Sequence, residues 1–540
     1  MSLLPPHATC GEALVHLLAA YGIDTVFGIP GVHTVSLYRG LPQTTIRHIT
    51  PRHEQGAGFM ADGYARVSGK PGVCFIITGP GMTNILTAMG QAYADSVPML
   101  VISSVNKTHQ LGLGEGRLHE LKNQSEMVAG VAAFSHTLMR PQDLPKVLAR
   151  AFSVFNSSRP RPVHIEIPID IIDAPFGEPS VRAAALPDKP CAPKEALAQA
   201  GAWMRHAVRP LLLLGGGCAR ADPARVQALV EAWDAPVCCT INAKGLLPNG
   251  HPLQLGSNQS LPAVRELAAQ ADVVLAIGTE LGETDYDVVF DGNFQLGGRL
   301  IRIDIDAEQL QRNHLADLAI VGDAADAVSR LADMMAAAPI SRQGAQRAAA
   351  VREALAAYWP PAWLKQAAVL AQVRQTLPGV IVVGDSTQPV YSGNHLYEPD
   401  TPRAWFNAST GYGTLGYALP AASGAKLAAP HRPVVCLIGD GGIQFTLPEL
   451  ASAVEAGIGI VVLLWNNHGY GEIKRYMRRE GLPEIGVDIY TPDFQTLARG
   501  FGCQSARVSN LAELGAALRQ AAPNRPTLIE IVEDDFDADR

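Results

Sequence analysis

Cysteine is scarce in this sequence, and long hydrophobic runs are absent. The eight cysteines among 540 residues are scattered and form no CxxC pair, so neither a disulfide framework nor a zinc site is indicated, and we expect reduced thiols. The longest apolar run, residues 457–465, is about the length of one buried strand, whereas a membrane span needs about 20 residues. Residues 1–7 lack the basic start and the apolar stretch of a signal peptide. We therefore expect a cytoplasmic protein that makes no contact with a membrane.

Charge is also modest. Charged residues make up 17% of the chain and hydrophobic residues 47%, with a formal net charge of −8. This composition provides ample material for buried cores and argues against disorder. A mildly acidic chain is poorly suited to bind nucleic acid or an anionic membrane, so a small-molecule partner is expected. The length exceeds what one core supports and predicts three domains, at roughly 150–200 residues each.

Short apolar runs alternate with helical patterns and glycine-rich turns, which predicts parallel sheets covered by helices. Strands are expected at residues 73–78, 99–103, 210–214, 273–277, 300–305, 380–383, 434–438 and 460–464. Helices are expected at residues 59–67 and 345–357, and the proline-rich stretch 175–193 is expected to be a linker. The predicted fold class is α/β, with three doubly wound parallel-sheet domains at residues 1–175, 195–335 and 360–540.

A Gly-Asp-Gly-Gly sequence, residues 439–442, carries the strongest chemical signal. It follows the predicted strand 434–438, and Asn467 follows the next predicted strand. The carboxyl ends of parallel strands form the edge where α/β sheets bind ligands, and glycines let the backbone approach a diphosphate. Asp440, Asn467 and the carbonyl of Gly469 offer the hard oxygens that Mg²⁺ prefers. A glycine turn unrelated to the distant asparagine is the alternative at this point.

A second motif favours the metal and diphosphate site over the unrelated glycine turn. Residues 53–66 read His-Glu-Gln-Gly-Ala-Gly-Phe-Met-Ala-Asp-Gly-Tyr-Ala-Arg. Together with Asp440 and Asn467, this motif resembles the thiamine-diphosphate enzymes of the acetolactate synthase and 2-oxo-acid decarboxylase superfamily. The resemblance makes the three domains pyrimidine-binding, central and diphosphate-binding. It also implies that Glu54 bonds N1′ of the cofactor aminopyrimidine and thereby promotes loss of the thiazolium C2 proton. Outside this motif, a buried glutamate would more often belong to a salt bridge.

Further loops resemble the same family in chain order, at residues 78–84, 385–388 and 411–422. Leu415 matches an apolar wedge that holds the cofactor in a bent form. In the family, the glutamate and the diphosphate site of one active centre come from two chains, which implies at least a homodimer, and a homotetramer is expected. The implied contacts of thiamine diphosphate, besides Glu54, are Thr78, Pro80, Asn84, Gln388, Gly413, Leu415, Gly439, Asp440, Gly441, Gly442, Asn467, Gly469 and Tyr470, with Asp440, Asn467 and Gly469 on Mg²⁺.

The central segment departs from acetolactate synthases. Their Arg-Phe-Asp-Asp-Arg stretch, associated with FAD, is replaced here by Gly-Thr-Glu-Leu-Gly-Glu-Thr-Asp-Tyr-Asp at residues 278–287. The glycines at 215–217 lack the full GxGxxG spacing, because position 220 is Arg. FAD is therefore not expected. The overall pattern most resembles decarboxylases of 5-guanidino-2-oxopentanoate (2-ketoarginine), which yield 4-guanidinobutanal and CO₂. An acetolactate-synthase-like carboligase and a decarboxylase of another 2-oxo acid are the alternatives.

A guanidinium tail requires carboxylate partners. Residues 280–287 carry four carboxylates, of which Glu283 and Asp285 are the first candidates, and a solvated acidic loop is the alternative. Further candidates for substrate contact are Val32, His33 and Glu472, although Glu472 would also suit the first turn of a helix. His119 matches a loop that reaches the active site in the family. It is the candidate proton donor, with an ordinary surface histidine as the alternative.

Overall fold

The computed structural model describes residues 2–288, 290–337 and 341–538. Two compact units can be distinguished. The first comprises Met1–Asp188, Gly411–Arg507 and Gln520–Asp534, and the second comprises Lys189–Thr410, Val508–Arg519 and Asp535–Arg540.

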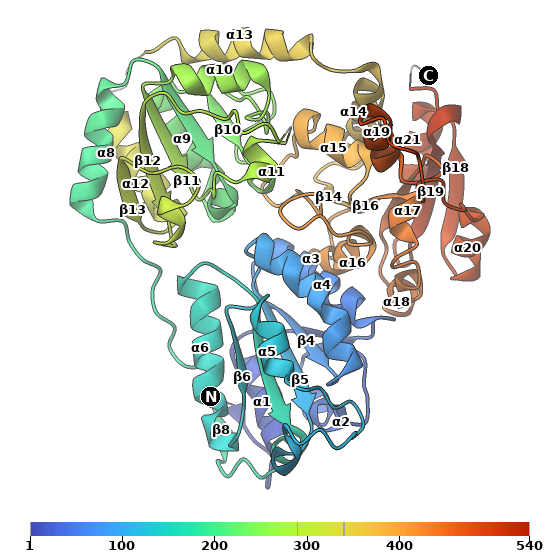
Figure 1. Cartoon of the computed structure of the whole chain (residues 1–540). Coiled ribbons are helices and arrows are strands. Elements are labelled where there is room, and N and C mark those ends of the chain that lie inside the picture. Colours follow the sequence, from blue (N-terminus) through green and yellow to red (C-terminus); the bar gives the residue numbers. More distant parts are fainter. Residues whose placement is uncertain (1, 289, 338–340, 539–540) are drawn as a thin grey trace. The chain divides into compact units, whose positions relative to one another are not determined.

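The first unit opens with six parallel strands in the order β3-β2-β4-β5-β7-β6 (Figure 1). The chain leaves β2 toward one side of the sheet and returns through β4 on the other, so the loops after β2 and β4 meet at a topological switch point, where sheets of this kind bind ligands. The strands are β2 (Thr25–Gly28), β3 (Arg47–Ile49), β4 (Gly72–Ile76), β5 (Met99–Val105), β6 (Phe134–Thr137) and β7 (Val163–Pro168).

Helices cover both faces of this sheet. Alternate strand residues such as Phe75 and Ile102 share one buried cluster with Leu14 and Leu148, which come from helices on that face. The remaining strand side chains face α3 and α4, and α3 packs in addition against α16. The elements concerned are α1 (Cys10–Ala20), α2 (Val35–Tyr38), α3 (Glu54–Ser68), α4 (Pro80–Ala94), α5 (Gln124–Ala129), α6 (Leu144–Ser157), α7 (Ile169–Ile172), α16 (Ala418–Ala428) and the antiparallel pair of β1 (Ser2–Leu3) with β8 (Ser180–Val181).

The same unit contains a second set of parallel strands in the order β16-β17-β19. Their side chains are buried throughout, as expected for parallel strands covered on both faces. Asp440 comes directly after β16 and Asn467 directly after the neighbouring β17, so the register brings them to one edge. The elements are β16 (Val434–Gly439), β17 (Val461–Asn466), β18 (Gln504–Val508), β19 (Thr527–Val532), α17 (Asp440–Ile443), α18 (Glu449–Glu455), α19 (Gly471–Arg479) and α20 (Phe494–Gly500).

The second unit contains a five-stranded parallel sheet in the order β10-β9-β11-β12-β13 (Figure 1). Alternate residues of β9 separate into two buried clusters, with Leu212 and Leu214 against α8, α9 and α12, and Leu211 and Leu213 against α10 and α13. The parallel pair β14 and β15 belongs to the same unit. Its elements are α8 (Lys194–His206), β9 (Pro210–Leu214), α9 (Pro223–Trp233), β10 (Val237–Cys239), α10 (Pro262–Gln270), β11 (Val273–Ile277), α11 (Glu283–Tyr286), β12 (Arg299–Asp304), β13 (Leu318–Val321), α12 (Ala324–Ala336), α13 (Gly344–Ala356), α14 (Pro361–Thr376), β14 (Ile381–Gly384), α15 (Gln388–Leu396), β15 (Trp405–Asn407) and α21 (Leu511–Arg519).

The predicted α/β class with parallel sheets is confirmed, and each predicted strand is present to within about two residues. The helix predicted at residues 59–67 begins earlier, at Glu54, because the ring nitrogen of His53 accepts the backbone N–H of Gln55 and caps the helix. Histidine is not among the usual N-cap residues, so this start could not be predicted from the capping pattern. The predicted linker is irregular apart from β8. Across the described ranges, no helix has both the length and the apolar character needed to cross a membrane.

Candidate active site

Glu54 is the first residue of α3, and α4 fixes its carboxylate. The side-chain amide of Asn84 donates to Glu54 Oε2 at 2.9 Å. A Cβ atom at Gly81 would lie 3.3 Å from Glu54 Oε1, so the first turn of α4 borders the other oxygen. The half-buried carboxylate is therefore oriented by the hydrogen bond from Asn84, and its Oε1 borders the first turn of α4.

The loop that leads into α4 is held by Gln124, a residue that the sequence reading missed. Gln124 Oε1 accepts the Thr78 hydroxyl at 2.8 Å and the Gly79 N–H at 3.2 Å. The Gln124 amide in turn donates to Glu166 Oε2 at 2.9 Å, and burial raises the pKa of Glu166. Gly79 has φ +73°, and a Cβ there would lie 2.9 Å from the backbone of His119. Only glycine suits this position, which explains its place in the motif.

His33 and His119 come together, although they are 86 positions apart. Their Nδ1 atoms are 3.3 Å apart, and their rings meet edge to face with centroids at 5.2 Å. Burial, followed by the positive charge of His119, lowers the pKa of His33. The carbonyl of His119 accepts the Thr78 hydroxyl at 3.3 Å, which ties this pair to the loop before α4. Val32, beside the pair, is 70% exposed. His33 and His119 were predicted separately as site residues, and the contact between them was not predicted.

At the ends of β16 and β17, three oxygen-bearing groups converge. Asp440 is 1% exposed, and its Oδ2 accepts the N–H of Gly469 at 2.8 Å. The terminal amide atom of Asn467 lies 3.1 Å from Asp440 Oδ1 and 2.8 Å from the Gly469 carbonyl oxygen. If that atom is nitrogen, it donates to both oxygens. If it is oxygen, three oxygens face one another, an arrangement that a cation reconciles.

This donor set suits Mg²⁺, which takes one or two protein carboxylates together with neutral oxygens and phosphate. Among the described residues, no group of three or more His, Cys, Asp or Glu side chains is placed to hold a metal. That finding does not bear on the present site, because its donors are one carboxylate, one amide and one carbonyl. Gly469 has φ +147°, and a Cβ there would lie 2.3 Å from the Val487 carbonyl oxygen, so glycine is required.

The other predicted cofactor residues are placed as follows. The ring of Tyr470 lies against Gly441, where a Cβ would be 2.6 Å from the ring. Leu415 is half-buried between two anchored residues, because the Thr414 hydroxyl donates to Gln91 at 2.8 Å and the Gly416 carbonyl accepts from Thr446 at 2.7 Å. Pro80 begins α4, Gly413 is exposed, Gln388 is buried at the start of α15 in the second unit, and Gly439 and Gly442 are buried on either side of the Asp440–Gly441 pair.

Two carboxylates of the acidic run in the second unit, Asp285 and Asp287, bind neighbouring groups of the protein. Asp287 pairs with Arg265 at 2.6 Å and accepts the N–H of Gly292 at 2.7 Å. Asp285 Oδ1 accepts the N–H of Ile241 at 3.0 Å. Glu283 is exposed at the start of α11, and within the described ranges its carboxylate makes neither a hydrogen bond nor an ion pair. Glu283 is thus a member of the run whose carboxylate is available to a ligand.

Glu472 has a partner within its own helix. It lies in the first turn of α19 and pairs with Arg475 at 3.0 Å, with 55% of its side chain exposed.

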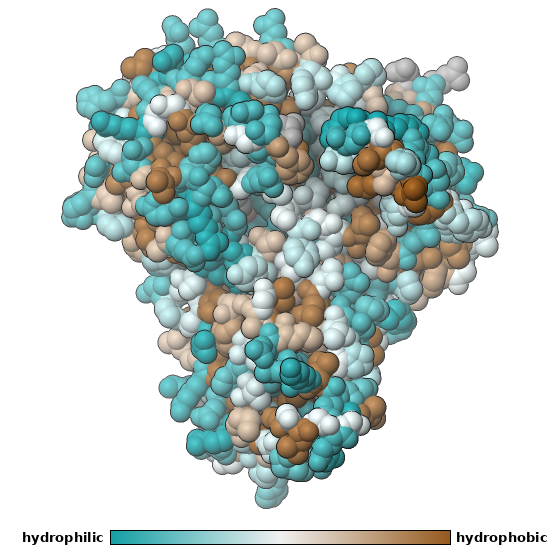
Figure 2. All heavy atoms as spheres, in the orientation of Figure 1, coloured by the Kyte–Doolittle hydropathy of each residue, from teal (hydrophilic) through white to brown (hydrophobic). Residues whose placement is uncertain are grey.

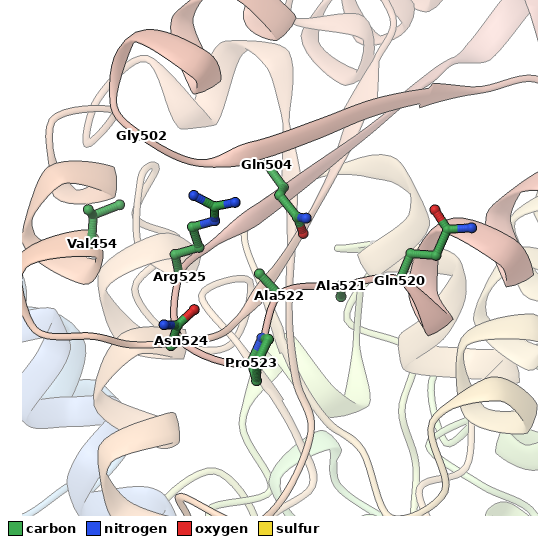
Figure 3. A pocket seen from close by; sticks show the side chains of 9 residues that line it. All are labelled: Val454, Gly502, Gln504, Gln520, Ala521, Ala522, Pro523, Asn524 and Arg525. Atoms are coloured by element: carbon green, nitrogen blue, oxygen red, sulfur yellow. The ribbon is translucent and has the colours of Figure 1, made fainter.

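A surface hollow of about 610 Å³ between the loops at residues 502–504 and 520–525 contains none of the predicted site residues (Figure 3). It is shallow and open, and it lies apart in sequence from every motif described above.

Comparison with known proteins agrees with this geometry. Sequence models of the thiamine pyrophosphate enzymes match three segments: the N-terminal TPP binding domain at residues 8–127, the central domain at 197–331 and the C-terminal TPP binding domain at 385–531. The chain is 47% identical over 528 residues to the probable 2-ketoarginine decarboxylase AruI of Pseudomonas aeruginosa, covering 97% of this chain and 94% of that protein.

Acetolactate synthases are also similar. The large subunit of isozyme 1 from Escherichia coli is 33% identical, over 96% of this chain and 92% of that subunit. The large subunit from Corynebacterium glutamicum is 32% identical, over 98% and 88% respectively. The fold and the matched segments define a three-domain α/β enzyme that binds a thiamine cofactor. The chain belongs to the thiamine pyrophosphate enzyme family, as the two motifs predicted.

Proposed function

We propose that this protein catalyses the non-oxidative decarboxylation of a 2-oxo acid with thiamine diphosphate and Mg²⁺, and that its substrate is 5-guanidino-2-oxopentanoate. The C1–C2 bond breaks, CO₂ leaves, and one proton is taken up at the former C2 to give 4-guanidinobutanal. The observation that carries the proposal is the oriented carboxylate of Glu54 in a chain that also presents the Asp440, Asn467 and Gly469 oxygens. The 47% identity to a probable 2-ketoarginine decarboxylase supports the substrate.

Two parts of the chain would hold the cofactor. Asp440, Asn467 and the Gly469 carbonyl would hold Mg²⁺ against the diphosphate, and Leu415 would support the bent form. Glu54 would bond the aminopyrimidine, with Asn84 keeping its carboxylate in place. When bound, the cofactor supplies the electron sink for the broken C1–C2 bond. The protein contributes orientation, and it excludes water from a step in which a charged carboxylate is lost.

His119 would deliver the proton that the product takes up. A histidine titrates near neutral pH and can give and regain a proton in each turnover. At 3.3 Å, the Nδ1 atoms of His119 and His33 are close enough to share one proton. Burial, followed by the charge of His119, lowers the pKa of His33. His33 and Val32 would line the substrate side of this pair.

The guanidinium tail would be recognised by the acidic run of the central domain, with Glu283 as its first contact. Asp285 would act with it, although one of its oxygens already holds the Ile241 N–H. Glu472 is the further candidate, and it would have to give up Arg475. The charge-assisted, bidentate match of a carboxylate to a guanidinium is the chemical reason for this choice.

We further propose a cytoplasmic homodimer or homotetramer in which Glu54 of one chain serves a cofactor held by Asp440 of another. Large apolar side chains are exposed in the first unit, among them Phe445, Ile473 and Tyr476. Figure 2 shows brown patches in the region where Figure 1 labels α17 and α19. A subunit contact would cover such patches. FAD would not be bound, because the Gly215 and Gly217 N–H groups are taken by the carbonyls of Ile277 and Gly278.

The test is a panel of 2-oxo acids, including 5-guanidino-2-oxopentanoate, pyruvate and benzoylformate. CO₂ release and aldehyde formation are measured with and without thiamine diphosphate and Mg²⁺. The proposal expects the guanidino acid to have the highest kcat/KM and to yield an aldehyde. Formation of acetolactate from pyruvate as the main reaction would favour the carboligase alternative instead.

A further inference from the structure

One buried titratable group near the site, Glu449, is not used by the proposed chemistry. Glu449, in the first turn of α18, is 1% exposed. Its Oε1 accepts the backbone N–H of Arg52 at 3.0 Å and that of His53 at 3.1 Å. Its Oε2 accepts the Ser452 hydroxyl at 2.6 Å. The two backbone donors belong to the residues that immediately precede Glu54.

The same carboxylate touches the first turn of α3. A Cβ at Gly56 would lie 2.2 Å from Glu449 Oε1, so the carboxylate occupies the space that a side chain at position 56 would need. Glu449 thus holds the chain before Glu54 through two hydrogen bonds and lies against the chain after it. The glycine in the His-Glu-Gln-Gly motif is required by this contact.

We propose that Glu449 is a positioning residue that fixes the start of α3 and, through it, the carboxylate of Glu54 toward the cofactor aminopyrimidine. The inference rests on the proposed function only in the role it gives to Glu54. A carboxylate that accepts backbone N–H groups is the stronger form of such an anchor, and a neutral carboxyl or amide offers fewer acceptor sites to the same donors.

The surroundings make this anchor sensitive to pH. Burial raises the pKa of Glu449 to about 7, against the opposing effects of its hydrogen bonds and of the Arg52 charge. Charged groups on the preceding chain and on the packed helix α16 have other partners. The Arg52 guanidinium pairs with Glu455 of the same helix α18. Arg47 donates to the Ala456 carbonyl, and Lys426 of α16 donates to the Arg432 carbonyl. His53 and Glu54 are the titratable residues that follow Arg52 in the chain. The anchor is expected to weaken as pH falls through about 7, when the carboxylate gains a proton.

Two measurements without any 2-oxo acid test the proposal in Glu449→Gln. The first is backbone amide exchange of residues 50–56 in the cofactor-free protein, which should be at least fivefold faster than in the wild type at pH 8. The second is deuterium exchange of the thiamine C2 proton in the holoenzyme, which should be at least tenfold slower, with cofactor affinity changed less than threefold. Glu455→Gln is the matched control on the same helix, because Glu455 is exposed and pairs with the Arg52 guanidinium rather than with the backbone before Glu54. Both rates should stay within twofold.

Ser452→Ala provides a second variant that keeps both backbone hydrogen bonds. It removes one bond to the charged form of Glu449, so the acid limb of the C2 exchange profile should move to higher pH. A folded Glu449→Gln protein whose amide exchange or C2 exchange remains within twofold of the wild type would overturn the proposal, as would an acid limb unmoved by Ser452→Ala. Because neither readout requires a 2-oxo acid, failure of the proposed decarboxylation would be seen separately.

Discussion

The acidic run offers a comparison that separates substrate recognition from structure. Glu283 is exposed and free of partners within the described residues, whereas Asp287 is tied to Arg265 and to the Gly292 N–H. Glu283→Gln should therefore weaken use of the guanidino acid without destabilising the protein. An exposed ion pair contributes about 1 kcal/mol, which corresponds to about fivefold in kcat/KM. If a partner chain or closure buries the pair, the loss should approach that of a charged hydrogen bond, about 1.5–3 kcal/mol.

The assay is kcat/KM for 5-guanidino-2-oxopentanoate and for pyruvate, with the ratio of the two as the readout. Glu283→Gln should lower the ratio about fivefold or more, mainly through the KM of the guanidino acid. Asp287→Asn is the control, and it should lower the melting temperature while leaving the ratio within twofold. If Glu283→Gln leaves the ratio unchanged, this carboxylate does not bind the tail. If Glu472→Gln lowers it instead, the recognition lies on α19.

Four further outcomes test the cofactor and the stability of the fold. Glu54→Gln should retain cofactor binding within about tenfold in a titration but lose at least 100-fold in kcat, and near-normal turnover would remove Glu54 from its role. Asp440→Ala should lose Mg²⁺-dependent binding of thiamine diphosphate, because the diphosphate keeps its charge without a bridging metal. Purified active protein should show no flavin absorbance band at ~450 nm. For Glu449, the folded state keeps a proton between about pH 4.5 and 7 that the unfolded state releases. Stability should therefore fall as pH rises through this window, by up to roughly 3 kcal/mol, and a Tm comparison between pH 5 and 8 should show a flatter profile in Glu449→Gln.

Much of the fold was predictable because parallel strands that are buried on both faces leave continuous apolar runs. The run at residues 273–277 became β11 without a change of boundary, and the helix at 345–357 became α13 within one residue. The chemical motifs were predictable for a different reason. Asp440 and Asn467 follow neighbouring strands, and sheet topology alone brings them together. The domain boundaries at 175, 195, 335 and 360 and the roles of the site residues remain predictions.

The acidic run shows what could not be predicted from the sequence, namely which of its carboxylates is available to a substrate. Four carboxylates within eight residues look equivalent in sequence, but their surroundings differ. The Arg265 side chain, 22 positions earlier, neutralises Asp287, and the Ile241 N–H occupies Asp285. Neither partner is close enough in sequence to belong to the motif. A local pattern can therefore count the charges of such a loop, but it cannot tell which charge remains available to a substrate.

Gln124 and Glu449 were not predicted from the sequence, for a related physical reason. Both bind backbone N–H groups of motif residues far away in the chain, Gln124 at Gly79 and Glu449 at His53. Burying an amide or a carboxylate is costly unless several donors or acceptors converge on it, so each of these side chains is surrounded by partners from at least two elements. The available signal was a polar residue within an apolar segment, as in Glu-Leu-Ala-Ser-Ala-Val at the start of α18. That signal indicates only that a buried polar group needs partners. Because the partners here precede Glu54 itself, we expect the orientation of the carboxylate proposed for catalysis to depend on a residue that the cofactor motifs do not include.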